Sequence, residues 1–351
     1  MANDDGAPFY EEEHGPPPGA PQATTGATKT ALVDWKWLRD CGETFLSTAP
    51  PARRWLLKRG DDGVLPLGKV GMIAGAGAAG KTMALAQLAL AIASGADVKR
   101  NAEIGAPGKW LATFTVDEPG HVLLALGEED LEEMQRRLFN AARMMGLEGH
   151  ARARARERLA LLPLAGESVA FLRNDERRNL ETTEAYRLLR ERLEGAGVEW
   201  RAIILDPLSR FAGADAEKDN AAATRFVETL ETLSKVKGNP TVLVAHHTSQ
   251  NARKEGSNDA TGARGVTALT DGVRWVAGLE RGPLKWSARL TSWKTNYSQG
   301  WEDVWLVRDS ENGGALRPES SAEKAGRETA QEEKPKAGRA APSPKTTDPD
   351  A

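Results

Sequence analysis

The 351-residue chain is long enough to bury one large hydrophobic core or two smaller ones. Its shares of hydrophobic (40%) and charged (28%) residues exclude the collagen-like, coiled-coil and wholly disordered classes. Its net charge of -3, from 47 Lys and Arg against 50 Asp and Glu, excludes nucleic-acid binding through overall charge, so any such contact must be local.

A single cysteine, Cys41, excludes a disulfide framework and a cysteine-based zinc site, and it fits a reducing compartment. The N-terminus shows no basic region followed by an apolar stretch, so we expect no secretory signal. The longest apolar run, 83–93, is shorter than the roughly 20 residues that span a bilayer. We therefore expect a cytoplasmic protein with no membrane segment.

The two ends of the chain differ in composition from its middle. Residues 1–30 combine acidic clusters with proline, and residues 318–351 are dominated by charged and small residues, so both are expected to be disordered tails. Residues 31–66 hold several tryptophan, leucine and phenylalanine side chains, which predict a small helical cap against the core. The core itself is expected over 67–317.

Within the core, short apolar runs alternate with helix-length amphipathic stretches. Five runs predict buried strands, at 70–74, 122–126, 159–164, 202–205 and 241–245. Helices are expected over 81–94, 130–147, 182–194 and 221–236, and further short strands after residue 272. This order predicts an α/β fold with a mostly parallel central sheet, flanking helices and C-terminal β-strands.

A run of alternate arginines precedes the third predicted strand. It consists of Arg152, Arg154, Arg156 and Arg158. Alternation does not place these side chains on one stripe of a helix, so the run is interpreted as a solvated connector.

The first predicted strand leads into a phosphate-binding loop. Its residues are Gly75, Ala76, Gly77, Ala78, Ala79, Gly80, Lys81 and Thr82, which match the eight-residue Walker A pattern between a strand and a helix. Small residues let the backbone N–H groups wrap around a β-phosphate, and the helix N-terminus adds partial positive charge. Lys81 is expected to reach the β- and γ-oxygens of ATP, and the Thr82 hydroxyl to bind Mg²⁺.

Two carboxylates follow other predicted strands. Asp206 ends the strand at 202–205, and because parallel strands meet ligands at their carboxyl edge, it is predicted to face the metal beside Thr82. Glu128 follows the strand at 122–126 and is predicted to orient the attacking water. The adjacent Glu129 and Asp130 are expected to cap the next helix.

Residues 248–262 contain Gln, Asn, Arg, Lys and Gly but no large apolar side chain, which predicts a mobile loop. Such a loop can bind the backbone phosphates of single-stranded DNA, or it can be a surface loop without a ligand.

Together these motifs resemble those of the RepA-type hexameric replicative DNA helicases of broad-host-range plasmids. The shared motifs begin at Gly75 and continue, in order, with Leu126-Gly127-Glu128-Glu129-Asp130, Leu205-Asp206-Pro207-Leu208-Ser209-Arg210-Phe211, His246-His247-Thr248-Ser249, Arg264-Gly265, Asp271 with Arg274-Trp275, and Lys294-Thr295-Asn296-Tyr297. More distantly, the chain looks like the RecA and DnaB cores. The resemblance implies a RecA-like P-loop ATPase that uses ATP and Mg²⁺, binds single-stranded DNA and assembles into a homo-oligomeric ring, a hexamer.

The resemblance also implies roles for individual residues. His247 would sense the γ-phosphate, and Arg137 would stack on the adenine. Arg274 would be an arginine finger for the neighbouring subunit, with Arg264 as its rival and Lys294 as a further phosphate contact.

Simpler interpretations of the same residues remain open. His247 can be an ordinary histidine at a strand end, and Arg274 can pair with Asp271 on the surface. At the level of function, the alternatives are a RecA-like recombination mediator or regulatory switch that does not unwind DNA, and a nucleotide-binding module that does not hydrolyse.

Overall fold

The computed structural model describes residues 36–97, 106–177, 179–213, 216, 219–248 and 267–332. The chain divides into two compact units, Met1–Ala52 and Arg53–Ala351. In the described part of the first unit, a short 3₁₀ helix, η1 (Leu38–Cys41), has no buried residue. All the other described helices and strands belong to the second unit.

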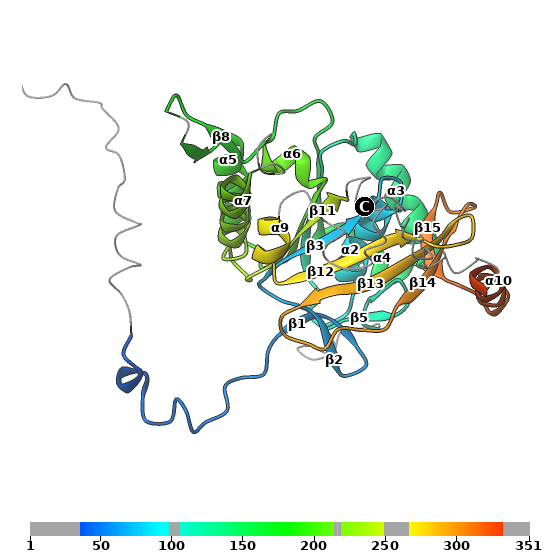
Figure 1. Cartoon of the computed structure of the whole chain (residues 1–351), viewed down its shortest axis with the longest axis horizontal. Coiled ribbons are helices and arrows are strands. Elements are labelled where there is room, and N and C mark those ends of the chain that lie inside the picture. The colour runs from blue at the N-terminus through cyan, green and yellow to red at the C-terminus, as the bar shows by residue number, and fades with distance from the viewer. Residues whose placement is uncertain are drawn as a thin grey trace, which may run out of the picture. The chain divides into compact units, whose positions relative to one another are not determined.

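A central sheet of nine strands in the described residues organises the second unit, in the order β15-β14-β13-β12-β3-β11-β10-β6-β7 (Figure 1). The parallel strands are β3 (Val70–Gly75), β6 (His121–Leu126), β7 (Leu159–Pro163), β10 (Trp200–Asp206), β11 (Thr241–His247) and β12 (Trp275–Arg281). The antiparallel strands that extend the sheet from β12 are β13 (Ser287–Thr295), β14 (Val304–Asp309) and β15 (Ala315–Pro318). The predicted α/β class with a mostly parallel sheet and C-terminal strands is confirmed.

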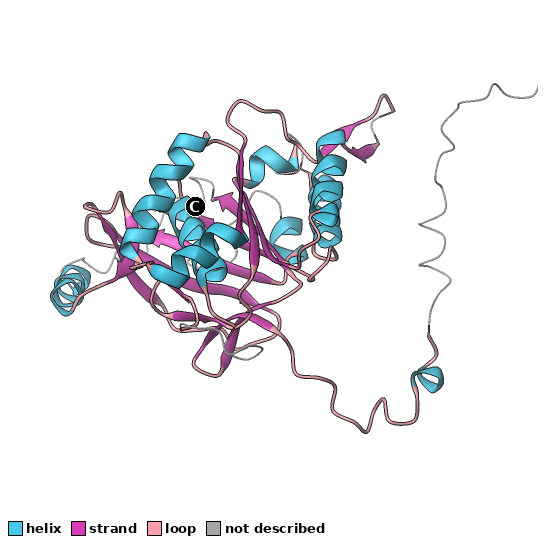
Figure 2. Ribbon diagram, turned by 180° about the vertical axis from the view of Figure 1, so that it is seen from behind, coloured by secondary structure: helices cyan, strands magenta, loops and turns pink. Residues whose placement is uncertain are grey.

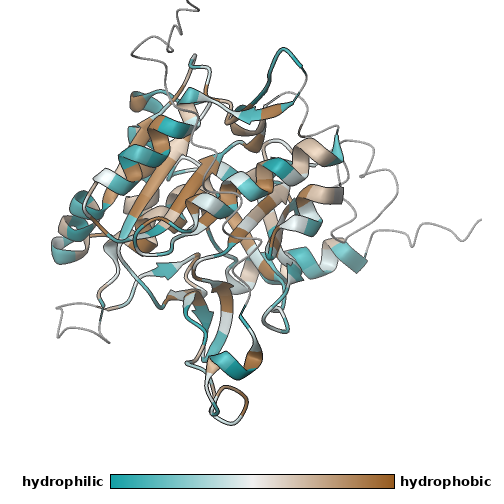
Figure 3. Cartoon of the chain, turned by 90° about the vertical axis from the view of Figure 1, so that its left-hand side faces the viewer, coloured by the Kyte–Doolittle hydropathy of each residue, from teal (hydrophilic) through white to brown (hydrophobic). Residues whose placement is uncertain are grey.

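Helices cover both faces of this sheet (Figures 1 and 2). One layer consists of α2 (Lys81–Ser94), α3 (Leu131–Met144) and α4 (Gly149–Arg158); the other consists of α5 (Glu184–Gly195), α6 (Leu208–Ala212), α7 (Asn220–Leu233) and α9 (Thr267–Gly272). Strand β3 contributes to both layers, since Ile73 packs in the first hydrophobic cluster and Met72 in the second. This alternation is the two-residue period of a strand buried on both faces, and the inner strands are accordingly hydrophobic in Figure 3.

The expected helical cap at 31–66 is wrong for the residues after Ala52. They form a hairpin of β1 (Trp55–Arg59) and β2 (Asp62–Pro66), which joins β5 (Phe114–Val116) and β4 (Lys109–Trp110) in a separate four-stranded sheet. The turn signal lies between the strands, where Gly60 has a φ of 61°. Counting apolar residues identified a core contribution here but not the turn that makes it a hairpin.

The expected disordered tail at 318–351 is also wrong in part, because residues Ser321–Glu332 form helix α10. Its Arg327 is buried, donates to both carboxylate oxygens of Glu319 and lies 4.3 Å above the Trp305 ring. A second arginine, Arg317 of β15, donates to both carboxylate oxygens of Glu323 at 2.8 Å, so two arginines anchor a segment whose composition is otherwise typical of disorder. Residues 333–351, like 1–35 at the other end, lie outside the described residues.

The alternate arginines form helix α4 rather than the expected connector. Arg154 Nε donates to the carbonyl oxygen of Ser94 at 2.8 Å, and Arg158 Nη1 donates to that of Gly95 at 3.0 Å. These carbonyls end helix α2, where cations are favourable and backbone oxygens lack helical partners. The arginines thus cap the helix that follows the phosphate-binding loop.

No helix in the described ranges is long and apolar enough to cross a bilayer.

Replacing both capping arginines tests this role. The change Arg154→Ala with Arg158→Ala should lower the free energy of unfolding by about 1 to 3 kcal/mol, since two charge-assisted hydrogen bonds are lost. Urea unfolding of the full chain measures it. Arg156→Ala, an exposed position of the same helix, is the control, and an equal effect of that change would refute the capping role.

Candidate nucleotide-binding site

The phosphate-binding loop lies between β3 and α2, at the carboxyl edge of the central sheet. Its backbone takes left-handed conformations at Ala78 (φ 57°) and Gly80 (φ 103°). A β-carbon on Gly75 would lie 2.1 Å from the Leu279 carbonyl oxygen, so only glycine fits there. The loop then delivers the N-terminus of the 14-residue helix α2, a favourable place for an anion.

Lys81, the first residue of α2, points back into this loop. Its ammonium donates to the carbonyl oxygens of Gly75 at 2.8 Å and Ala76 at 3.0 Å. The side chain is buried, and burial lowers the pKa of Lys81 to about 8, partly opposed by the negative charge of Asp206. Phosphate oxygens bound at this loop would favour the charged ammonium and raise that pKa.

His247, the last residue of β11, lies next to Lys81. Strand β11 pairs with β3, with His247 opposite Gly75, and His247 Nδ1 is 3.3 Å from Lys81 Nζ. The imidazole therefore contacts the same side chain that is expected to hold the γ-phosphate. This position is compatible with a sensor, a role that stays a prediction.

Asp206 ends β10 and faces Thr82. The carboxylate is buried, and burial raises the pKa of Asp206, while the hydrogen bond from the Thr82 hydroxyl and the charge of Lys81 lower it. Its Oδ2 atom is buried without a hydrogen-bond partner in the described structure. A hydroxyl and a buried carboxylate oxygen are hard oxygen ligands, so the pair fits Mg²⁺.

A magnesium ion held by Thr82 and Asp206 would have positions left for water and phosphate oxygens. Within the described residues no group of three or more His, Cys, Asp or Glu side chains could hold a metal ion. Magnesium prefers six oxygen ligands and usually keeps several waters and substrate phosphates. Thr82 and Asp206 thus fit a magnesium ion that arrives with a nucleotide.

Glu128 and Glu129 lie in the turn after β6, which is joined to β10 by a 2.7 Å hydrogen bond from Gly127 N to Asp206 O. The side chain of Glu128 is 57% exposed, lies 3.8 Å from Arg210 and acts on Asp206 by charge repulsion. Glu129 is only 18% exposed and accepts a 2.5 Å hydrogen bond from Arg137. The more accessible carboxylate beside the metal pair is therefore Glu128, the predicted water-orienting residue.

Arg137 lies on α3 between carboxylates. Besides Glu129 it contacts Glu133 at 3.4 Å, and its charge acts on Asp206. The predicted role of Arg137 in base binding stays a prediction. The observed contacts place its guanidinium beside Glu129 and Glu133.

Arg274 lies at the amino ends of the parallel strands, opposite the carboxyl ends where the phosphate-binding loop lies. Its backbone N–H donates to the carbonyl oxygen of Val70 at the start of β3, whereas the phosphate-binding loop follows the end of that strand. A six-residue strand separates the two ends by roughly 16 Å at about 3.3 Å per step. The structure shows no ion pair between Arg274 and Asp271, both of which are described.

Lys294 lies beside Arg274. Its ammonium donates to the carbonyl oxygens of Thr270 at 2.8 Å and Asp271 at 2.9 Å, and the pKa of Lys294 is lowered by burial and by the charge of Arg274. The two cations thus form a pair remote from their own phosphate-binding loop. Arg264, the rival finger, and residues 249–262 of the predicted DNA-binding loop lie outside the described residues.

Three residues near the loop were missed by the sequence analysis. Arg281 Nη2 donates to the Gly77 carbonyl oxygen at 3.2 Å, and Arg308 Nη1 donates to that of Ala78 at 2.8 Å. Trp286, half exposed, lies beside Arg308. They come from β12, its turn and β14, more than 200 residues beyond the loop, and no local pattern signals such a contact.

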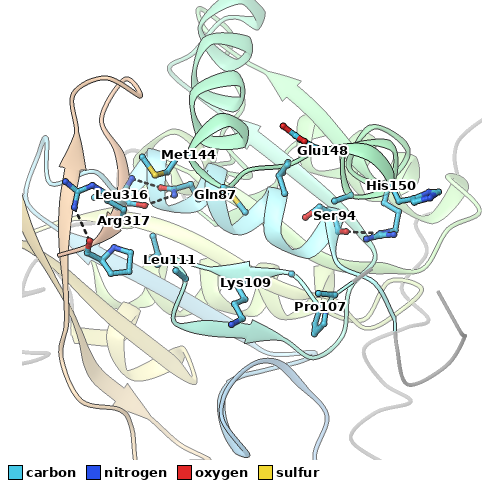
Figure 4. A pocket seen from close by; sticks show the side chains of 18 residues that line it. Gln87, Ser94, Pro107, Lys109, Leu111, Met144, Glu148, His150, Leu316 and Arg317 are labelled. Atoms are coloured by element: carbon cyan, nitrogen blue, oxygen red, sulfur yellow. Dashed lines mark hydrogen bonds between the residues drawn. The ribbon is translucent and has the colours of Figure 1, made fainter. Parts of the chain in front are cut away.

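A cavity of about 610 Å³ lies elsewhere, behind α2 (Figure 4). Its walls include Gln87, whose amide both donates to and accepts from the backbone of Leu316 at 2.8 Å, and Ser94, which Arg154 caps. The amide of Gln87 and the carbonyl group of Ser94 are thus satisfied within the fold. None of its lining residues belongs to the phosphate-binding loop.

Comparison with known proteins gives matches to both the sequence and the fold. A family model described as an AAA domain matches residues 38–253, more than half of the chain. Among solved structures, one described as an ATPase domain aligns with 14% identity and a TM-score of 0.46, over 72% of this chain and 85% of that one. The RadB recombinase aligns with 14% identity and a TM-score of 0.45, over 72% of this chain and 92% of that one. A DnaB-like replicative helicase, described together with its interactions with primase, aligns with 13% identity and a TM-score of 0.47, over 72% of this chain and 58% of that one.

The lowered pKa of Lys81 predicts how nucleotide affinity depends on pH. Binding of Mg-ATP needs the charged ammonium, so the affinity should be constant well below pH 8, begin to fall as the pH approaches 8, and fall by up to about tenfold per pH unit above it. Titration with a fluorescent ATP analogue between about pH 7 and 9.5 measures this. Lys81→Arg keeps its charge throughout, so its weaker affinity should be independent of pH, and a flat wild-type profile would contradict the prediction.

Proposed function

The chain belongs to the AAA domain family and is a P-loop ATPase, and from this premise we propose that it is a ring-forming DNA helicase. In this proposal it hydrolyses ATP with Mg²⁺ and moves along single-stranded DNA in plasmid, phage or mobile-element replication. One observation supports ATP hydrolysis: Lys81, the Thr82–Asp206 pair and Glu128 lie together at the carboxyl ends of the parallel strands.

Each group at this edge has a distinct task in phosphoryl transfer. The loop backbone and Lys81 bind the β- and γ-phosphates, and Thr82 with Asp206 holds the magnesium ion that neutralises them. Glu128 orients the attacking water from the adjacent strand end. This division of tasks disfavours a module that only binds nucleotide, because such a module has no use for the water-orienting carboxylate.

The cations at the far edge support assembly into a ring. Arg274 and Lys294 cannot reach the phosphates of their own subunit across the length of β3. A head-to-tail contact between copies brings that edge to the next subunit's site, and such contacts form rings when the rotation closes. Six subunits, and Arg274 as the finger, are part of the proposal and rest on the RepA-type resemblance.

His247 connects the nucleotide site to the proposed DNA contact. It touches Lys81 at the end of β11, and the polar segment 248–262 follows directly. A change in the γ-phosphate at Lys81 would therefore displace the residue from which that segment starts. Its Arg253 and Lys254 supply the positive charge that backbone phosphates require.

A second candidate is a RecA-like ATPase that mediates recombination or acts as a switch without unwinding. It needs the same phosphate-binding loop, the same metal pair of Thr82 and Asp206, and the same water-orienting carboxylate, so the nucleotide site fits both proposals. Strand displacement on a forked duplex distinguishes them.

ATPase rates with and without single-stranded DNA, on material sized by light scattering, test the main proposal. We expect stimulation by DNA in a particle of several subunits, together with displacement of the duplex strand. ATP hydrolysis by a DNA-insensitive monomer would contradict it.

Glu128→Gln should lower kcat by about 10² to 10⁴ and leave the Kd for Mg-ATP within a few-fold, because the side chain acts on water and not on the phosphates. Steady-state hydrolysis and equilibrium binding measure the two effects. Glu132→Gln, an exposed change on α3, is the control. Loss of kcat in Glu129→Gln with full activity in Glu128→Gln would move the role to the neighbouring carboxylate.

Arg274→Ala should lower kcat by about 10³ or more while binding persists, as expected of an arginine finger. Mixing this variant with inactive Lys81→Ala protein should restore part of the activity, since one subunit then offers an intact loop and its neighbour an intact Arg274. ATPase assays across mixing ratios measure this. A mixture that stays inactive, or an Arg274→Ala protein of wild-type rate, would exclude action across the interface.

A further inference from the structure

Side chains of strands β12 and β14 contact the phosphate-binding loop. Arg281, the last residue of β12, holds the Gly77 carbonyl oxygen, and Arg308 of β14 holds that of Ala78. Arg308 also lies 3.9 Å from the position of a β-carbon on Gly80. The C-terminal strands thus form a wall beside the loop that is expected to bind phosphate.

Trp286 is a large, half-exposed apolar side chain beside Arg308. Its ring is 50% exposed, 5.7 Å from the Arg308 guanidinium and 5.5 Å from the Lys285 ammonium. Its φ of 69° lies in the left-handed region, which a bulky residue adopts at a cost. The fold therefore tolerates both an unfavourable backbone and an uncovered indole at this position.

The turn that carries the indole is closed by its own hydrogen bonds. The Trp286 carbonyl oxygen accepts from Arg308 N at 2.8 Å, and Gly282 N donates to the Ser287 carbonyl oxygen at 2.9 Å. Ser287 Oγ donates to the Leu284 carbonyl oxygen at 2.8 Å and accepts from Leu284 N at 3.1 Å. These hydrogen bonds order the backbone that carries the indole without a ligand, which lowers the entropic cost of stacking on it.

A nucleotide needs an apolar surface for its base, and the phosphate-binding loop, made of glycine and alanine, offers none. Arg137, the other candidate, is held by Glu129 and Glu133 on the carboxylate side. We propose that Trp286 is the stacking surface for the base of the bound nucleoside triphosphate, with Arg281 and Arg308 positioning the loop beside it. This inference rests on the proposed ATPase function. A stack reads the π-face of a base, so it also predicts little discrimination between ATP and GTP.

Comparing Mg-ATP with inorganic tripolyphosphate, which lacks a base, tests the stack in the full-length protein. Trp286→Ala should weaken Mg-ATP about 5- to 150-fold and leave tripolyphosphate unchanged, as loss of one base stack predicts. Trp286→Phe should recover most of the affinity, and Trp37→Ala, an exposed tryptophan in the other unit, should change neither. Isothermal titration calorimetry measures the wild-type protein and all three variants.

The outcomes separate this inference from the function on which it rests. Wild-type protein that binds neither ligand would refute the ATPase, whereas binding of both with an unchanged ratio in Trp286→Ala would refute the stack alone. Equal loss of both ligands would show that Trp286 only supports the loop. Selective loss of Mg-ATP in Arg137→Ala, with Trp286→Ala unaffected, would assign the base to α3 and overturn the inference.

Discussion

A buried ammonium facing a buried carboxylate is the constraint on which the nucleotide site depends. Lys81 and Asp206 are both at least 95% buried, and burial shifts the pKa of each toward its neutral form while their mutual attraction opposes the shift. Charges in an interior are tolerated only when they are paired or coordinated. The sheet order meets this need, since β3 and β10 end at the same edge with only β11 between them. The third strand contributes His247 to the same cluster.

Local patterns predicted the centre of this arrangement. The loop from Gly75 to Thr82 and the strand ending at Asp206 each combine a strand with a chemically distinctive end, so a short stretch of sequence suffices to find them. The parallel sheet followed from the same alternation of apolar runs and helices. These patterns do not show which of two neighbouring carboxylates is accessible, because Glu128 and Glu129 are adjacent and equally acidic. Only Arg137 and Arg210, on other elements, show which carboxylate is tied down.

The parts that sequence analysis missed depend on contacts between distant segments. The hairpin of β1 and β2 is stabilised by pairing with β5, some 60 residues later, so its residues could not show whether they form a helix or a strand. The tail at 321–332 is ordered by the contacts of Arg327 with Glu319 and Trp305 and by the ion pair of Arg317 with Glu323. Likewise Arg281 and Arg308 reach the phosphate-binding loop only because the antiparallel strands extend the sheet beyond β12. Composition and periodicity describe each segment alone and do not report such partners.

Strand β3 joins the two ends of the site in one inflexible element. All six of its residues are buried, and it is hydrogen-bonded along both sides, to β11 and to β12. A strand held in this way cannot stretch or slip without breaking ladder bonds. It therefore holds Val70, at its first residue, and Gly75, at its last, at a fixed separation. The spacing between the backbone that carries Arg274 and the phosphate-binding loop is therefore fixed by one fully paired strand.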